Sequence, residues 1–291
     1  MNKIYLDYDQ AQLDAQYDQA TLVPDLTEYQ ARFTARTKAA KAAYRCIERV
    51  AYGSHNDEWM DVYCPAHGRN GASGAPVVVF FHGGAWRVQQ GSTMGTAAPA
   101  YVEAGAIFVA VNFSVAPEAN LDVMMRQSRD ATAHAAKHAA EWGGDANRLF
   151  VLGHSSGAHQ ASNVAVTDWR GYGLPSDLVK GLGVTSGPYD LEPVILSKRN
   201  EYLHMDPAMA KRNTAANYLR GDLPPAIVAW GGKELAEFKR QGEAFADAWE
   251  GATGSVTRLV FPDNNHFDQY DEIAKPDSHF TLSFLAMMGL G

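Results

Sequence analysis

The sequence of 291 residues is poor in cysteine, with only Cys46 and Cys64. Two cysteines in a chain of this size do not form a disulfide framework, so a reducing cytoplasm is the expected location. We expect both to be packing residues rather than nucleophiles. The first twenty residues are polar and acidic, and they lack the apolar core of a signal peptide.

Long apolar runs and clusters of positive charge are also missing. No apolar run reaches the roughly 18 residues that span a bilayer. The formal net charge is -8, and no long run of lysine or arginine occurs. Neither a membrane nor a nucleic acid is therefore an expected partner. The composition, 46% hydrophobic and 20% charged, is ordinary for a globular protein with a sizeable core, and it leaves both a monomer and a homodimer open.

Six short apolar runs predict β-strands. They lack the polar alternation of half-exposed strands, so we expect them to be buried on both faces. Helix-like segments lie between them, and such alternation indicates an α/β fold, a mostly parallel sheet with helices on both faces. The predicted strands are residues 75–81, 106–113, 148–153, 181–186, 226–230 and 257–261, and the main predicted helices are 121–142, 237–250 and 278–288.

The chain is expected to form one domain, residues 1–291, with residues 1–55 as an N-terminal helical extension that is a candidate cover of the site. Residues 27–50 have helical composition and begin at a plausible N-cap, Thr27. The tyrosines of this extension, Tyr5, Tyr8 and Tyr17, either pack over the site or simply dock on the domain. A polar stretch with three glycines, residues 68–76, predicts a turn before the first strand.

A candidate nucleophile follows the predicted strand 148–153. The sequence there is Gly-His-Ser-Ser-Gly, with Ser155 at its centre. In a G-x-S-x-G turn between a strand and a helix, the serine lies on a sharp bend with its hydroxyl exposed, and bulky neighbours would collide there. The pattern alone is weak, but the strand before it and the helix-compatible residues after it favour a nucleophile.

A serine nucleophile needs a base and an acid that orients the base. In this arrangement the order along the chain is Ser, then Asp or Glu, then His. His266 follows the predicted strand 257–261 and is the expected base. The other downstream histidines fit less well, because His159 and His279 lie in helical patterns and His204 lies in an irregular stretch.

The acid should follow the preceding strand, 226–230. Glu234 lies nearer the strand end and is favoured over Glu237, which opens a helix and suits its first turn. Asp247 lies deep in that helix. Asp263 and Asp268, close to the base in sequence, stay open as alternative acids.

Backbone N–H groups are needed for the negative charge that develops on the carbonyl oxygen. One should come from Ser156, the residue after the nucleophile. The others are expected in the loop after strand 75–81, where Gly83 and Gly84 let the backbone approach the substrate closely.

Together these motifs carry a family resemblance. HGGAW, NFSVAPE, GHSSGAH, SGPYDLEP, GGKELAEF and NNHF resemble the α/β-hydrolase serine esterases, and the chain is most similar to the kynurenine formamidase (arylformamidase) family. The resemblance implies the same triad of Ser155, Glu234 and His266. It also implies oxyanion donors at Gly83, Gly84 and Ser156, and substrate contacts from the residues His82, Trp86 and Tyr189.

The expected activity is therefore hydrolysis of aryl formamides of the N-formylkynurenine type through an acyl-enzyme, with small aromatic amides or esters as ligands. A short-chain carboxylesterase with the same machinery is one alternative, and a non-catalytic ligand-binding protein of this fold is another. No cofactor or metal is expected. His134, His138 and Glu141 share a helix face, but the sequence has no H-E-x-x-H motif and no phosphate-binding loop.

Overall fold

A single eight-stranded sheet forms the centre of the molecule. The computed structural model describes residues 2–65, 74–88 and 91–291, so the turn predicted at 68–76 lies mostly outside the described residues. The strands are β1 (Arg45–Ala51), β2 (Trp59–Cys64), β3 (Ala75–Phe81), β4 (Ile107–Val111), β5 (Gly144–His154), β6 (Val179–Thr185), β7 (Ala226–Gly231) and β8 (Val256–Phe261).

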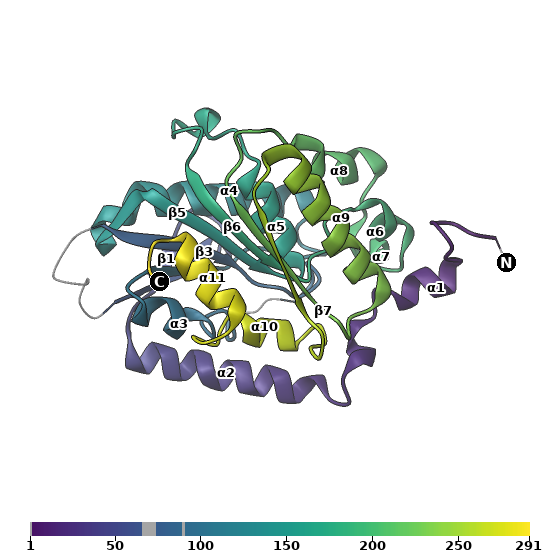
Figure 1. The fold of residues 1–291 in the computed structure, drawn as a ribbon, viewed down its shortest axis with the longest axis horizontal. Coiled ribbons are helices and arrows are strands. Elements are labelled where there is room, and N and C mark those ends of the chain that lie inside the picture. The colour runs from purple at the N-terminus through teal and green to yellow at the C-terminus, as the bar shows by residue number, and fades with distance from the viewer. Residues whose placement is uncertain (1, 66–73, 89–90) are drawn as a thin grey trace.

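The sheet has the order β1-β2-β4-β3-β5-β6-β7-β8. β2 is antiparallel to both of its neighbours, β1 and β4. All remaining pairs, from β4 through β3 to β8, are parallel. The predicted α/β architecture with a mostly parallel sheet is thus confirmed, and the carboxyl ends of its parallel strands meet at one edge of the sheet (Figure 1).

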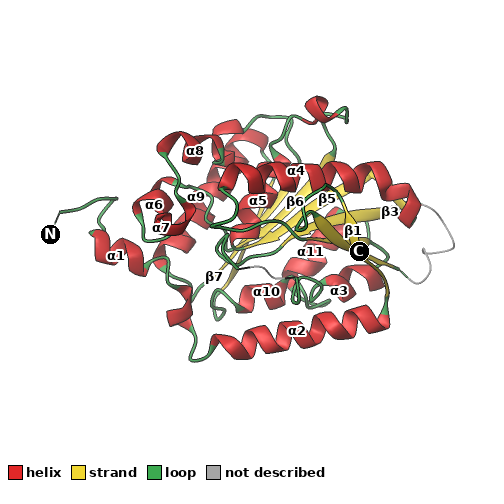
Figure 2. Cartoon of the chain, turned by 180° about the vertical axis from the view of Figure 1, so that it is seen from behind, coloured by secondary structure: helices red, strands yellow, loops and turns green. Residues whose placement is uncertain are grey.

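Helices cover both faces of this sheet (Figure 2). α2, α3, α10 and α11 lie on one face, and α4, α5 and α9 lie on the other. No described helix has the length and apolar character that crossing a membrane would require. The helices are α1 (Gln10–Ala15), α2 (Leu26–Ala43), α3 (Ala98–Glu103), α4 (Leu121–His138), α5 (Ser156–Ala165), α6 (Glu192–Leu196), α7 (Asn200–Leu203), α8 (Pro207–Arg212), α9 (Ala236–Thr253), α10 (Asp268–Glu272) and α11 (His279–Met287).

Strand β3 shows why the central strands read as continuous apolar runs. Val77, Val79 and Phe81 pack in the core under α4 and α5, whereas Val78 and Phe80 pack in the core under α2 and α3. All five side chains are fully buried. Each contributes about 1.5–3 kcal/mol to folding through removal of apolar surface from water.

The predicted helix over residues 27–50 is wrong only in its last seven residues. α2 ends at Ala43, and residues 45–51 instead form β1, which pairs with β2, a strand that the sequence pattern did not predict. The N-cap of α2 is Asp25 rather than Thr27, and the Asp25 carboxylate accepts the Thr27 N–H. β1 and β8 are the edge strands, and both have several exposed side chains. The prediction that β8 is buried on both faces is therefore wrong.

Two of the predicted helix ends also move. α4 ends at His138 and continues as a 3₁₀ turn, residues 139–142. α9 runs through Gly251 to Thr253 and ends at Gly254, which has a φ of 69°. A glycine in the left-handed region ends a helix, whereas a glycine inside a helix costs only about 1 kcal/mol, which a packed helix tolerates.

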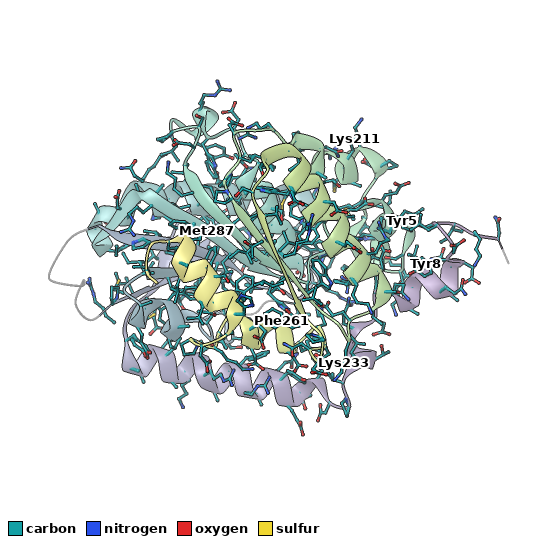
Figure 3. All side chains as sticks on the ribbon, in the orientation of Figure 1. Tyr5, Tyr8, Lys211, Lys233, Phe261 and Met287 are labelled. Atoms are coloured by element: carbon teal, nitrogen blue, oxygen red, sulfur yellow. The ribbon has the colours of Figure 1, made fainter. Side chains whose placement is uncertain are left out.

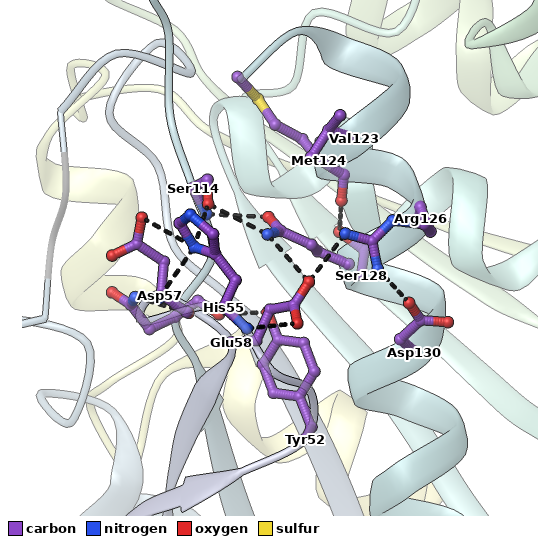
Figure 4. Close-up of polar contacts among 12 residues, drawn as sticks. Tyr52, His55, Asp57, Glu58, Ser114, Val123, Met124, Arg126, Ser128 and Asp130 are labelled. Atoms are coloured by element: carbon purple, nitrogen blue, oxygen red, sulfur yellow. Dashed lines mark hydrogen bonds and ion pairs between the residues drawn. The ribbon is translucent and has the colours of Figure 1, made fainter. Parts of the chain in front are cut away.

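A buried carboxylate ties the antiparallel edge of the sheet to α4 (Figure 4). Glu58, between β1 and β2, accepts hydrogen bonds from Arg126 Nη2 at 2.8 Å, from Gln127 Nε2 at 3.3 Å and from the His55 N–H at 3.1 Å. The Gln127 side chain also accepts the Ser114 N–H at 2.9 Å. This network fixes the β1–β2 hairpin on the parallel part of the sheet.

Candidate active site

Ser155 occupies the sharp turn between β5 and α5. Its φ of 56° and ψ of -128° lie outside the regions that most residues adopt. The Ser155 N–H donates to the carbonyl oxygen of Thr185 on β6 at 3.0 Å, which holds the turn at the end of the sheet. The side chain faces a cavity rather than the core.

Close packing explains the two glycines of this turn. A Cβ at Gly153 would overlap the carbonyl oxygen of Gly157, and a Cβ at Gly157 would overlap the carbonyl oxygen of Phe81 on β3. α5 therefore packs against the backbone of β3 and β5 at a distance that only glycine allows.

The imidazole of His266 joins Ser155 to Glu234. His266 Nε2 lies 2.9 Å from Ser155 Oγ, and His266 Nδ1 lies 2.9 Å from Glu234 Oε2. The other carboxylate oxygen, Oε1, accepts the Ser186 hydroxyl at 2.5 Å and the Gly231 N–H at 2.7 Å. Ser155, Glu234 and His266 follow the ends of β5, β7 and β8, and all three are buried.

Electrostatics keep this carboxylate charged. Burial raises the pKa of Glu234, but the hydrogen bonds from His266, Ser186 and the Gly231 N–H outweigh it, so the pKa falls below its ordinary value. His154 Nε2 donates to the carbonyl oxygen of His266 at 3.0 Å. Burial lowers the pKa of His154 to about 3, so this imidazole is neutral and holds the backbone of His266 in place.

The other acids considered lie elsewhere. Glu237 opens α9, as expected, and pairs with Arg240. Asp247 pairs with Arg258, and Asp263 is exposed beside Lys233. The carboxylate of Asp268 accepts the hydroxyl of Tyr29 at 2.8 Å. The structure thus brings Glu234, and none of these four, to the imidazole.

The remaining downstream histidines are not at the nucleophile. His159 is buried in α5, where its Nε2 donates to the carbonyl oxygen of Asn213 at 2.7 Å, and burial lowers its pKa to about 4. His204 ends α7 in the left-handed region, and His279 begins α11. His159 thus lies beneath the site, as its position in the helix predicts.

The loop after β3 lies against the serine. A Cβ at Gly83 would be 3.0 Å from Ser155 Cβ. Ala85 and Trp86 have φ values of 54° and 57°, a conformation that costs of order 1–3 kcal/mol for each residue. The Trp86 N–H donates to Ser156 Oγ at 3.3 Å, which holds the strained loop on the first turn of α5.

The first turn of α5 offers a free backbone N–H beside the nucleophile. Ser156 is the first residue of α5, so its N–H has no acceptor within the helix. Gly83 and Gly84 line the same cavity as Ser155. The three predicted oxyanion donors therefore lie in the two segments that border the serine.

A cavity of about 260 Å³ reaches Ser155 and His266. His82, predicted to contact substrate, is among its lining residues. The N-terminal segment supplies another wall, from Tyr17 to Phe33. Tyr5 and Tyr8 are not part of that wall, and Figure 3 shows them on the N-terminal arm beyond it. Of these three tyrosines, Tyr17 alone therefore lines the cavity.

Aromatic rings of the N-terminal segment meet aromatic rings of the segment that follows His266. Phe33 contacts Tyr270 edge to face, with 4.7 Å between the ring centroids, and Tyr29 lies 5.5 Å from Phe267. The sequence pattern missed Tyr29 and Phe33 as site residues, because nothing in a helical pattern says that its apolar face will meet the loop carrying the base.

Trp86 and Tyr189 are not among the residues that line the cavity, so their contact with substrate stays a prediction. Trp86 is 1% exposed, and its ring packs edge to face on His159 at 5.3 Å. The ring of Tyr189 stacks on Phe245 at 4.1 Å. The left-handed conformation of the loop turns the indole beneath the site instead of into it.

The helix-face histidines form a surface group. The rings of His134 and His138 stack at 4.1 Å, and His138 Nδ1 lies 2.7 Å from Glu141 Oε1. Within the described part of the chain, no three His, Cys, Asp or Glu side chains are grouped so that they could hold a metal ion.

A serine at a strand-to-helix turn, joined to an imidazole and a carboxylate at the ends of later strands, defines a serine hydrolase of the α/β-hydrolase type. Comparison with known proteins agrees. Residues 78–268 match the model of a family described as alpha/beta hydrolase fold, so the chain belongs to the α/β-hydrolase family, and within it to a group that includes kynurenine formamidases.

Two relatives carry the finer relation. The chain is 31% identical to a kynurenine formamidase of Salmo salar over 259 residues, which cover 87% of this chain and 85% of the relative. It is 30% identical to a kynurenine formamidase of Danio rerio over 261 residues, with the same coverage of both chains.

Among solved structures, the fold resembles the carboxylesterase EstE1 from a metagenomic library, with a TM-score of 0.70 and 19% identity over 91% of this chain and 95% of that one. An esterase of Pyrobaculum calidifontis has a TM-score of 0.70 and 18% identity over 94% of this chain and 97% of that one. At these identities the likeness shows the fold.

Proposed function

We propose that the protein is an arylformamidase, a serine hydrolase that removes the formyl group from N-formylated aromatic amines of the N-formylkynurenine type. The contacts of His266 with Ser155 and Glu234, each 2.9 Å, carry the chemistry of the proposal. The two kynurenine formamidases that resemble this chain over most of its length support the substrate class.

In the first half of the reaction, Ser155 Oγ attacks the formyl carbon while His266 Nε2 takes the hydroxyl proton. The carbonyl π pair moves onto oxygen, where the N–H groups of Gly83, Gly84 and Ser156 stabilise the charge. The C–N bond then breaks as the imidazolium gives its proton to the leaving amine. The products of this half are a formyl ester on Ser155 and the free aromatic amine.

In the second half, His266 removes a proton from water, and the hydroxide attacks the formyl ester. The C–O bond to Ser155 breaks, the imidazolium returns its proton to Ser155 Oγ, and formate leaves. Glu234 stays ionised throughout and stabilises the imidazolium through its contact with Nδ1, in keeping with its lowered pKa.

The cavity suits a small aromatic substrate. Its volume of about 260 Å³ leaves room for one substituted ring, and Tyr29, Phe33, Phe267 and Tyr270 offer ring faces and edges to it. A formyl group is the smallest acyl group, so little of this space is needed on the acyl side.

The test compares steady-state rates on N-formylkynurenine with rates on a series of phenyl esters, from the acetate to the hexanoate. We expect the formamide to have the highest kcat/KM, and rates on the esters to fall as the acyl chain lengthens, since each methylene without space costs about 1–3 kcal/mol. Long-chain esters as the best substrates would overturn the formamidase assignment in favour of a carboxylesterase.

Replacement of the nucleophile tests the machinery shared by both activities. Ser155→Ala should lower kcat by roughly 10⁶-fold on every substrate, as loss of a triad nucleophile does in other hydrolases, with little change in the melting temperature. Residual activity above a few percent would contradict the serine mechanism, whereas a native protein without turnover on any of these substrates would favour a ligand-binding protein.

A further inference from the structure

Two buried side chains in the wall of the cavity hold N–H donors without an acceptor. Arg199 is 7% exposed and Gln19 is 6% exposed. Among the described residues, Arg199 Nη1 and Gln19 Nε2 have no hydrogen-bond partner, although both atoms are fully buried. Both residues line the cavity that contains Ser155. Buried donors of this kind normally have a partner, so these two require an explanation.

The two side chains hold each other in place. Arg199 Nη2 donates to Gln19 Oε1 at 2.7 Å and to the carbonyl oxygen of Tyr17 at 2.9 Å. Because a guanidinium only donates, this contact assigns the oxygen end of the Gln19 amide to Arg199 and leaves its NH₂ group as the second free donor. The guanidinium also lies 5.1 Å from the ring centroid of Tyr17. The donor pair is therefore fixed before any ligand arrives.

The positive charge of Arg199 is not neutralised by the protein. No carboxylate within the described ranges forms an ion pair with it, and Asp18, which also lines the cavity, contacts Lys198 Nζ at 3.2 Å. Burial is the main cause that lowers the pKa of Arg199, and Tyr202, Tyr17 and Asp18 offset it only in part. A buried, unpaired cation is costly, so the site is electrostatically incomplete without an anion.

We propose that Arg199 and Gln19 form a carboxylate-binding subsite for the leaving group, so that the preferred substrates are aryl formamides or esters that carry a carboxylate beyond the ring. A carboxylate offers two oxygens, which match one free guanidinium N–H and one free amide N–H. The identity of this substrate rests on the proposed function, because Ser155 and the Arg199–Gln19 pair line one cavity.

The kinetic test uses a ratio that a merely structural role would not change. We compare kcat/KM for N-formylkynurenine with that for its primary carboxamide, which has the same shape without the charge. The native enzyme should favour the carboxylate. Arg199→Gln should reduce this preference by roughly 10- to 100-fold, the effect of a charge-assisted hydrogen bond, mainly through KM. Lys198→Gln, which removes the neighbouring exposed cation, should leave the preference unchanged.

A second variant keeps the test valid if Arg199→Gln fails to fold. Gln19→Glu is nearly isosteric, retains the oxygen that faces Arg199 and supplies the missing negative charge from within the protein. It should also abolish the preference for the carboxylate. An equal loss on both substrates in either variant, with the ratio unchanged, would show that Arg199 only holds the N-terminal segment, and would overturn the proposal.

Binding without turnover separates this proposal from the formamidase assignment. In Ser155→Ala protein, calorimetry should show that 4-phenylbutyrate binds more tightly than 4-phenylbutyramide, and that Gln19→Glu removes the difference. This result would support the subsite even if the enzyme hydrolysed no formamide. Equal binding of the acid and the amide would exclude the subsite even if formamide hydrolysis were found.

Discussion

Glu234→Gln probes the arrangement around the imidazole most directly. In the native site, three donors converge on the carboxylate: His266 Nδ1 at 2.9 Å, the Ser186 hydroxyl at 2.5 Å and the Gly231 N–H at 2.7 Å. A glutamine has one acceptor and one donor end. The Gly231 N–H cannot rotate away, so it competes with His266 for the single remaining oxygen.

Both orientations of the new amide are poor. If the amide oxygen accepts the Gly231 N–H, the amide NH₂ group faces His266 Nδ1. The imidazole must then carry its proton on Nε2. In this tautomer Nε2 can no longer accept the proton of Ser155. If the oxygen faces the ring, a buried NH₂ group opposes the Gly231 N–H, at a cost of about 1–3 kcal/mol. The inactive tautomer is therefore favoured, and kcat should fall roughly 10³- to 10⁴-fold.

Steady-state kcat on an aryl formamide and on phenyl acetate, normalised to folded protein, measures this loss. Glu237→Gln is the matched control, because the same change three residues along the chain removes a charge that pairs with Arg240 rather than one that contacts the imidazole. It should lower the melting temperature but alter kcat only a few-fold. If Glu234→Gln kept a tenth of the activity, or Glu237→Gln lost more, the role of Glu234 as the triad acid would be refuted.

Two further predictions concern packing and acid stability. Gly157→Ala should yield little folded or active protein, since its Cβ would overlap the carbonyl oxygen of Phe81; soluble yield and kcat measure this, and a fully active variant would contradict the close approach of α5. Burial lowers the pKa values of His82, His154 and His159 to about 4, 3 and 4. Between the ordinary value of about 6.5 and roughly pH 4, the unfolded chain therefore binds more protons, and the free energy of unfolding should fall by several kcal/mol as pH falls; a denaturation midpoint that stays constant over this window would refute it.

The strands that the sequence predicted well are those whose two faces are both buried. β3, β6, β7 and the second half of β5, residues 149–154, are buried on both faces, so their residues form nearly continuous apolar runs. β1 lies at the edge of the sheet and mixes exposed charge with half-buried residues, which also suits a helix surface, and its residues therefore read as an extension of α2. Pairing with β2, not local preference, decides the conformation of that segment.

The same distinction applies to the site. Ser155, Glu234 and His266 follow strands whose carboxyl ends share one edge of the sheet, so their meeting could be predicted from chain order. Arg199 and Gln19 belong to segments without a regular pattern, and their meeting depends on how the N-terminal segment folds over α7. Only the three-dimensional structure reveals that contact.

The attachment of the N-terminal wall has a consequence for the order in which the molecule is completed. Tyr29 contacts Asp268, and Arg32 contacts Asp271, across 239 residues of chain in each case. As the ribosome releases the chain, the N-terminal segment appears first, yet its partners emerge among the last residues to be made. The substrate cavity can therefore close only near the end of synthesis, when α10 and α11 complete the core beneath it. A chain that ends before Asp268 should therefore lack this attachment and hold an open, inactive site.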